Sequence, residues 1–330
     1  MKSAFLPCVR TALLGLALMF SAASAHAQTF PERAVTWINP YPAGSASDVT
    51  ARLFADEFSK AIKQPVVVIN KPGAGGLIGT NAGATAAPDG YTLLVGAIGT
   101  HVFNPVINSS TNYDPVKDFE PVSRIVSFPN VLVVSSKLGV NTVEELIALA
   151  KSKSASEPLL YSTAGNGTTS HIAAGQFERL AGVKLTGVNY KGTPAAVNEV
   201  LAGRIDFVFG NINVILPQVK AGTLKALAIA SSERYSLLPD TPTFNEVGMP
   251  EMEMVVWSGL FAPAGTPPEI VKVLNEAANT VARSGVLQPV YESAGATLEV
   301  DATPEDFAKL LQADTAKWVP VLKEMGIKAQ

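Results

Sequence analysis

Two loops rich in glycine and hydroxyl side chains contain the residue types best suited to bind a ligand. The first, residues 40–48 (PYPAGSASD), follows an apolar strand-like run and leads directly into a helical pattern. In an open α/β sheet, ligands lie where a strand ends and a helix begins, because the free N–H groups of the helix favour anions. The candidate binding residues of this loop are Tyr41, Ala43, Gly44, Ser45, Ser47 and Asp48.

A second reading explains the first loop without a ligand. Ser45 is also a suitable N-cap for the following helix, with Asp48 as its capping-box partner three residues later. Gly44 would let the backbone approach a ligand closely. The sequence leaves both readings open.

The second loop, residues 162–171 (STAGNGTTSH), has the same strand-to-helix setting about 120 residues later. Five hydroxyl side chains and two glycines fall within its first nine residues, more than ordinary helix capping requires. Neither loop contains Arg or Lys, so helix ends worth about 0.3–1 kcal/mol each when exposed would hold an anion reversibly. We expect His171 to pack or cap the helix, and the candidate binding residues are Ser162, Gly165, Gly167, Thr168 and Ser170.

Other motifs that could support chemistry are incomplete. Residues 73–79 (GAGGLIG) are one residue too long for the dinucleotide-binding fingerprint and lack an acidic residue about 20 positions further on. His101 and His171 lie 70 residues apart, without metal-ligand spacing, and the sequence has neither G-x-S-x-G nor a P-loop. We expect no cofactor, no metal and no catalysis. Asp206, a charge within an apolar run, is either a ligand-facing carboxylate or a buried structural residue, and residues 190–193 are either a pocket rim or a plain turn.

The composition allows two folded domains and excludes several classes of protein. The chain has 330 residues, of which 47% are hydrophobic and 16% charged, and its formal net charge is −3. Domains contain about 100–200 residues, and disordered chains are far less hydrophobic. With 25 Lys and Arg against 28 Asp and Glu and no basic run, the sequence has no electrostatic footprint for nucleic acid.

The N-terminus has the pattern of a secretory signal peptide. Lys2 and Arg10 precede a ten-residue apolar segment (TALLGLALMF), and an A-x-A sequence ending at Ala27 predicts cleavage after that residue. The apolar segment is about half as long as a membrane-spanning helix, which needs roughly 20 residues. Cys8, the only cysteine, precedes this segment and so cannot carry a lipid at the cleavage point. We expect an exported, unanchored protein without disulfides.

The elements that position the two loops alternate between strand and helix signals. Short β-branched runs flanked by Pro and Gly predict strands, and apolar residues at helical spacing between them predict helices. This alternation predicts an α/β fold of mostly parallel sheets with helices on both faces. We expect strands at residues 34–39, 65–70, 91–95, 130–134, 159–162, 185–190, 205–209 and 226–230, and helices at 49–62, 143–150, 171–180 and 194–201, with two more ending near 283 and beginning near 303.

Six collinear segments make the sequence similar to a known family. They are PYPAGSASDVTAR (40–52), NKPGAGGLIG (70–79), STAGNGTTSH (162–171), NYKGTPAA (189–196), LPDTPTFNEVG (238–248) and WSGLFAPAGTPPEIV (257–271). Together they resemble the Bug family, the periplasmic solute receptors of tripartite tricarboxylate transporters. The resemblance extends from the signal peptide to the final helix.

The resemblance implies a type II periplasmic binding protein, a two-lobed Venus flytrap hinged by crossing strands. It places the signal peptide at residues 1–27, the first lobe at 28–127 and 256–330, and the second lobe at 128–255.

The resemblance also implies roles for particular segments. In this family, the segments matching 41–48 and 98–101, which includes Thr100, hold a ligand carboxylate from one lobe, partly through bridging waters. The segment matching 162–170 and the region of Asp206 contribute from the other lobe. Ser45 stands where many relatives have a second glycine, so the size of the ligand does not carry over from the family.

We therefore expect a periplasmic, monomeric receptor that binds a small carboxylate between its lobes and delivers it to the permease subunits of a tripartite tricarboxylate-type transporter. For a ligand that carries an ammonium group, Asp48 or Asp206 is the expected counter-charge. Two alternatives stay open. A ligand-sensing receptor would use the same clamp to dock a signalling partner, and an exported hydrolase would need His101 or His171 as its general base.

Overall fold

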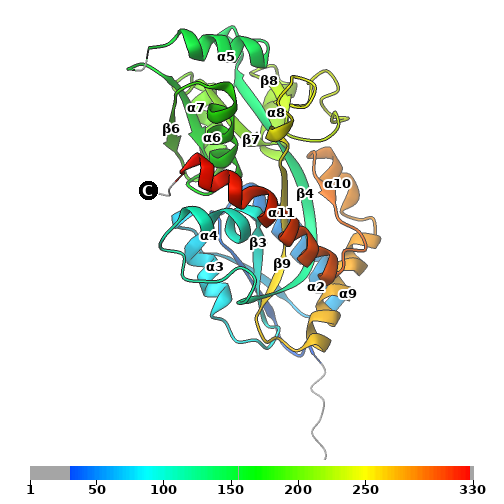
Figure 1. The fold of residues 1–330 in the computed structure, drawn as a ribbon. Coiled ribbons are helices and arrows are strands. Elements are labelled where there is room, and N and C mark those ends of the chain that lie inside the picture. The colour runs from blue at the N-terminus through cyan, green and yellow to red at the C-terminus, as the bar shows by residue number, and fades with distance from the viewer. Residues whose placement is uncertain (1–29, 155, 328–330) are drawn as a thin grey trace, which may run out of the picture.

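The computed structural model describes residues 30–154 and 156–327, and the predicted signal peptide lies outside them. Within the described residues, the chain forms a ten-stranded sheet with helices packed on both faces (Figure 1). The ribbon divides into two lobes joined by long strands (Figure 1). The predicted two-lobed α/β architecture is confirmed.

The first lobe contains the predicted N-terminal strand–helix–strand unit. β1 (Val35–Asn39) and β2 (Val66–Asn70) run parallel and are connected by α2 (Ala46–Ile62). β3 (Thr92–Ala97) is parallel to β1 on its other side. The aromatic side chains of Trp37 and Phe58 pack between β1 and α2, with ring centroids 5.1 Å apart. The lobe also contains η1 (Ala74–Gly76), α3 (Leu77–Ala84), η2 (Gly99–Phe103), α4 (Asn104–Ile107), α9 (Pro268–Arg283), α10 (Gln288–Ser293) and β10 (Thr297–Leu298).

The second lobe repeats this local arrangement. β5 (Leu159–Thr163) is parallel to β6 (Leu185–Asn189) and to β7 (Phe207–Asn211). α6 (Thr169–Ala181) and α7 (Thr193–Leu201) make the two crossovers, so both helices begin at the carboxyl ends of strands. The lobe also contains η3 (Ser136–Leu138), α5 (Val143–Ser152), α8 (Ile212–Lys220), β8 (Leu224–Ile229) and η4 (Pro250–Met252).

Two long antiparallel strands connect the lobes. β4 (Phe119–Ser135) pairs with β9 (Val255–Pro263) as far as Pro129, and from Asn130 onward it pairs with β7 and β8. The strand order is β2-β1-β3-β9-β4-β7-β5-β6. The sheet is therefore mixed rather than mostly parallel, because every pair made by β4 or β9 is antiparallel. The division of the chain at residues 128 and 255 stays a prediction.

The C-terminal helix lies across both lobes. α11 (Pro304–Met325) runs diagonally over the joint (Figure 1, red). The ring of Trp318 packs edge-on against Phe103 of the first lobe, with centroids 5.7 Å apart. Further along α11, Glu324 forms an ion pair with Arg179 of α6 at 3.2 Å. The helix therefore contacts the elements on either side of the crossing strands.

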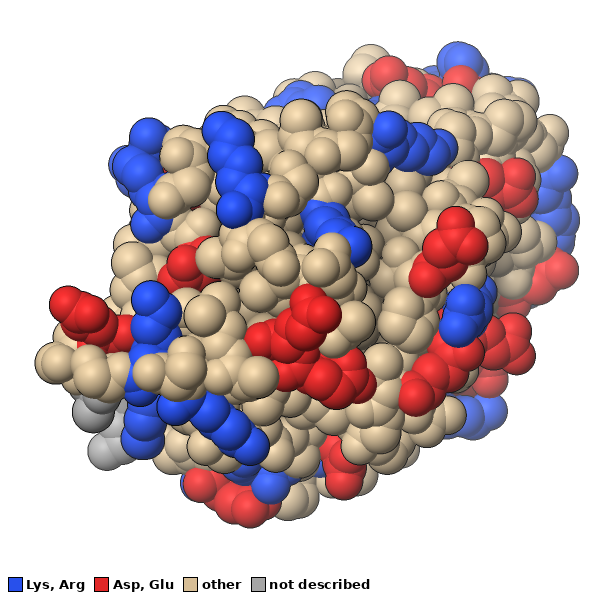
Figure 2. Space-filling view, turned by 90° about the horizontal axis from the view of Figure 1, so that it is seen from above, with Lys and Arg blue, Asp and Glu red and all other residues tan. Residues whose placement is uncertain are grey.

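Seen from the end that carries α5, positive and negative side chains are interspersed among uncharged ones, and neither sign covers this face (Figure 2). None of the helices in the described part of the chain combines the length and the apolar character that a membrane crossing requires.

Candidate ligand-binding site

A cavity of about 70 Å³ lies between the two lobes, at the N-terminal ends of four helices. Ser47 of α2 lines it from the first lobe, while Ser170 of α6, Thr193 of α7 and Asn211, the residue before α8, line it from the second. The first N–H groups of a helix have no partner within the helix, and that end carries a partial positive charge. The four helix ends make the cavity a favourable place for an anion.

The side chains around the cavity are uncharged. Within residues 30–154 and 156–327, the lining contains no Arg, Lys, His, Asp or Glu. Burial raises the pKa of Tyr41, which keeps its phenol protonated and able to donate a hydrogen bond. Ile98, Phe128 and Val256 add apolar surface. The cavity therefore suits a ligand with an anionic group and an uncharged remainder.

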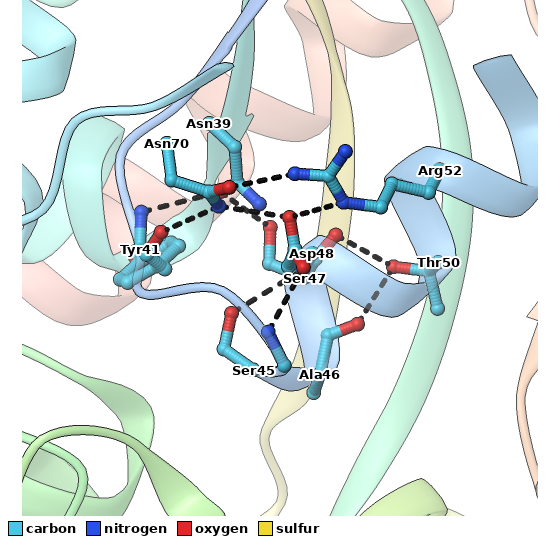
Figure 3. Close-up of polar contacts among 10 residues, drawn as sticks. Asn39, Tyr41, Ser45, Ala46, Ser47, Asp48, Thr50, Arg52 and Asn70 are labelled. Atoms are coloured by element: carbon cyan, nitrogen blue, oxygen red, sulfur yellow. Dashed lines mark hydrogen bonds and ion pairs between the residues drawn. The ribbon is translucent and has the colours of Figure 1, made fainter. Parts of the chain in front are cut away.

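The first loop is held by a small polar network (Figure 3). Ser45 caps α2, because its Oγ accepts the N–H of Asp48 at 3.3 Å. Asp48 in turn accepts the N–H of Gly44 at 2.9 Å, rather than that of Ser45 as in a regular capping box. Its other oxygen accepts from Arg52 Nε at 3.0 Å and from Asn70 Nδ2 at 2.8 Å. The capping interpretation of Ser45 is confirmed, and the N–H of Gly44 is already used within the protein.

The second loop is held by its own hydroxyl groups. Thr163 Oγ1 accepts the N–H of Gly165 at 3.0 Å, and Thr168 Oγ1 donates to the carbonyl of Gly165 at 2.6 Å. α6 then begins without a side-chain cap from Thr168. The first N–H groups of α6, those of Thr169 and Ser170, therefore receive no cap from Thr168 in the described structure. They lie at the end of the helix that lines the cavity.

The structure brings part of the predicted residue set together. Tyr41, Ser45, Ser47, Thr168 and Ser170 line the cavity, and Ala43, Gly44, Asp48, Gly165 and Gly167 belong to the same two loops but lie outside the lining. Whether any of them contacts a ligand stays a prediction.

Three further predicted side chains, which also lie outside the lining, bond to the protein itself. Ser162 Oγ donates to the carbonyl of Ala196 at 3.0 Å, and Thr100 Oγ1 donates to the carbonyl of Ala97 at 2.9 Å. Asp206 accepts the N–H of Leu160 at 2.7 Å, which ties β5 to the residue before β7. For Asp206 these contacts favour the structural reading over the ligand-facing one, since it does not line the cavity.

Comparison with known proteins now identifies the family. Residues 50–327 match the family model of the tripartite tricarboxylate transporter family receptor. This chain belongs to that receptor family. The predicted resemblance to Bug proteins is confirmed by BugT of Bordetella pertussis, which is 34% identical over 308 residues, covering 93% of this chain and 94% of BugT.

Solved structures agree with the receptor assignment. The periplasmic binding protein BugD is 30% identical, with a TM-score of 0.85 over 91% of this chain and 100% of its own. An R. palustris protein with adipate is 32% identical, with a TM-score of 0.85 over 91% of this chain and 99% of its own. MatC of Rhodopseudomonas palustris with bound malate is 34% identical, with a TM-score of 0.84 over 89% of this chain and 100% of its own.

The two described histidines of the receptor lie outside the cavity lining, His101 buried and His171 partly buried. Burial lowers the pKa of His101 to about 3, and its ring stacks on Phe261 with centroids 3.9 Å apart. His171 accepts the N–H of Gly167 at 3.2 Å, and burial lowers its pKa as well. His171 therefore braces the second loop, as the packing interpretation predicts.

Sequence reasoning found some of the residues that reach the cavity from outside the two loops and missed others. Ile98 and Gly99 fall in the segment 98–101 that the resemblance implied, and both line the cavity. Gly192 and Thr193 belong to the turn that the sequence left open between rim and turn, and the structure places them in the lining. Phe128 and Val256 come from the crossing strands, and Asn211 ends β7. Of Phe128, Val256 and Asn211, which the sequence analysis did not single out, only Asn211 stands at a strand-to-helix step, the signal that identified the loops.

We expect Asp48→Ala to lower the free energy of unfolding of the receptor by about 1–3 kcal/mol at pH 7, because Asp48 is buried and the N–H of Gly44 and the amide of Asn70 lose their acceptor. The exposed Asp56 on the same helix is the matched control, and Asp56→Ala should change stability by less than about 0.5 kcal/mol. Urea unfolding of both variants measures the difference. Equal stabilities would show that the network does not hold the loop.

The same network has a pH dependence with a definite sign. Burial alone would raise the pKa of Asp48, but the hydrogen bonds from Gly44, Arg52 and Asn70 outweigh it, and the pKa is lowered. Its stabilisation is therefore fully present above the unfolded-state pKa of about 4 and is lost as the pH falls through the lower folded-state pKa. The difference between wild type and Asp48→Ala should shrink in that acid range.

Proposed function

We propose that this receptor binds a small carboxylate with an uncharged body in the cavity between its lobes and delivers it to a permease of the tripartite tricarboxylate type. The observation that carries the proposal is the meeting of four helix N-termini around a cavity without charged side chains. A carboxylate there receives hydrogen bonds from backbone N–H and hydroxyl groups, which bind anions without a fixed counter-charge.

The related structures support the same ligand class. The R. palustris neighbour is described with adipate and MatC with bound malate, and both acids combine carboxylates with an uncharged remainder. Catalysis has less support, since both described histidines lie outside the lining and are kept neutral by burial. We further propose that the chain is exported to the periplasm after cleavage at Ala27 and acts there as a monomer.

A thermal-shift panel tests the proposal directly. The panel contains mono-, di- and tricarboxylates, malate and adipate among them, with nucleotides and neutral sugars as controls. A ligand at 100 times its dissociation constant stabilises the folded state by about 2.7 kcal/mol, which is readily detected. We expect at least one carboxylate to raise the melting temperature and no control to do so. A panel in which only a nucleotide or a sugar stabilises the protein would overturn the proposed function.

A further inference from the structure

The glycine-rich turn after β2 has no role in the cavity lining, yet its backbone is unusual. Gly73, Ala74, Gly75 and Gly76 all have positive φ angles, from 48° at Ala74 to 138° at Gly73. L-residues rarely adopt such angles, and glycine does so without steric cost. A local turn does not need so many consecutive positions of this kind.

The turn meets the second loop across the joint between the lobes. An added Cβ on Gly75 would clash with the carbonyl oxygen of Asn166 in the second lobe. A Cβ on Gly99, in the first lobe, would lie 2.9 Å from the carbonyl oxygen of Gly167. Backbone therefore lies directly on backbone at this contact, which only the absence of side chains permits.

Asn104 fills the space between the turn and the loop. Its Nδ2 donates to the carbonyl of Gly75 at 2.9 Å, which fixes the turn within the first lobe. Its Oδ1 is buried, has no hydrogen-bond partner in the described structure and faces Gly167, where an added Cβ would clash with it. An unpaired buried amide oxygen is costly, and water would satisfy it once the lobes separated. Close backbone approach, rather than a hydrogen bond of Asn104 Oδ1, therefore defines this contact between the lobes.

Hydrogen bonds and close packing hold both sides of this contact in place, so neither side can move without a cost in free energy. In the second lobe, Asn189 accepts from Thr163 Oγ1 at 2.6 Å and donates to Asn166 Oδ1 at 2.8 Å. In the first lobe, a Cβ on Gly79 would lie 2.6 Å from Pro40 Cα, so the helix after the turn rests against the end of β1. An added methyl group would therefore have to move one lobe away from the other.

We propose that Gly75, Asn104 and Gly167 form an interlobe latch that positions the second loop, with Thr168 and Ser170, over the bound carboxylate. Neither Gly75 nor Asn104 lines the cavity, so both act on the ligand only by setting how closely the two lobes approach each other. This inference rests on the proposed function, because it explains how the same cavity is closed.

The first experiment adds one methyl group to the contact between the lobes. Gly75→Ala should weaken binding of the tightest acid in the carboxylate panel by about 10- to 100-fold, the range expected from overpacking a close contact. Gly265→Ala is the matched control, since Gly265 also has a positive φ, of 82°, but its added Cβ would meet nothing within 4 Å. The control should keep its affinity within about threefold, and the two free variants should melt at similar temperatures. Calorimetry and thermal unfolding give both readouts.

The second experiment tests whether a substitution on one side of the contact offsets the loss of affinity caused by a substitution on the other side. Gly167→Ala should also weaken binding, because the new methyl group meets the side chain of Asn104. Gly167→Ala combined with Asn104→Ala removes that side chain and should bind more tightly than Gly167→Ala alone, a coupling that two independent folding defects would not show.

The outcomes distinguish a failure of the latch from a failure of the proposed function. If no acid in the panel binds the wild type, the proposed function fails and the latch fails with it. If an acid binds the wild type and Gly75→Ala equally well, or if the double variant binds no better than Gly167→Ala, the latch alone is overturned.

Discussion

A 2-amino derivative of the ligand should bind this receptor at least 100-fold more weakly than the same acid without the amino group. Burying an ammonium group without a carboxylate partner costs several kcal/mol, and each 1.4 kcal/mol is about a tenfold change in affinity. The two carboxylates that the sequence offered as counter-charges are both engaged elsewhere. Asp48 bonds to Arg52 and to the N–H of Gly44, and Asp206 bonds to the N–H of Leu160.

Calorimetry on three related acids measures this discrimination. The tightest acid of the panel is compared with its 2-amino and 2-hydroxy derivatives, as succinate would be with aspartate and malate. The hydroxy derivative is the control, since Ser and Thr hydroxyls around the cavity can pair with it, and it should bind within about tenfold of the parent acid. An amino acid that binds as tightly as its parent would mean that a carboxylate reaches the ligand, and the assignment of the cavity would be wrong.

Local patterns were sufficient for the elements that carry the two loops. β1, α2 and β2 follow from alternating β-branched and helical signals within one stretch of chain, and the N-terminal ends of α2 and α6 follow from Gly and hydroxyl residues directly after strands. The crossing strands followed only in part. The predicted strand at 130–134 is the end of β4, but the rest of β4 contains Pro121 and Pro129, and its partner β9 lies more than a hundred residues further on. Pairing at that distance leaves no local signal, so the mixed sheet could not be read from the sequence.

The same limit applies to the roles of individual polar residues. Ser162, Thr100 and Asp206 are polar residues in apolar surroundings, and such residues must bond either to a ligand or to the protein. The sequence shows the need for a partner but not which partner is near. In the structure, the partners are the backbone groups of Ala196, Ala97 and Leu160. The roles of the latch glycines could not be predicted from the sequence either, because the residues that they contact, Asn104 and Asn166, come from other parts of the chain.

Ser47→Asp should abolish carboxylate binding while leaving the receptor at least as stable as the wild type. Ser47 is the second residue of α2 and lines the cavity, where its Oγ donates to Asn39 Oδ1 at 3.2 Å. A negative charge in the first turn of a helix is favourable by about 0.3–1 kcal/mol, and Arg52 already neutralises the neighbouring Asp48. The same charge about 4 Å from a bound carboxylate costs about 4 kcal/mol at an effective dielectric of about 20, which is roughly a thousandfold in affinity.

The opposite signs of these two effects make the experiment decisive. Ser47→Asn has nearly the same shape without the charge and should keep its affinity within about tenfold of the wild type. Melting temperatures of the free proteins report the effect on the helix, and calorimetry with the tightest acid reports the effect on the ligand. A stable Ser47→Asp variant that binds as well as Ser47→Asn would place the anion away from the N-terminus of α2. Loss of binding in Ser47→Asp alone requires a negative ligand group beside that helix end, since no change in folding or shape distinguishes the two variants.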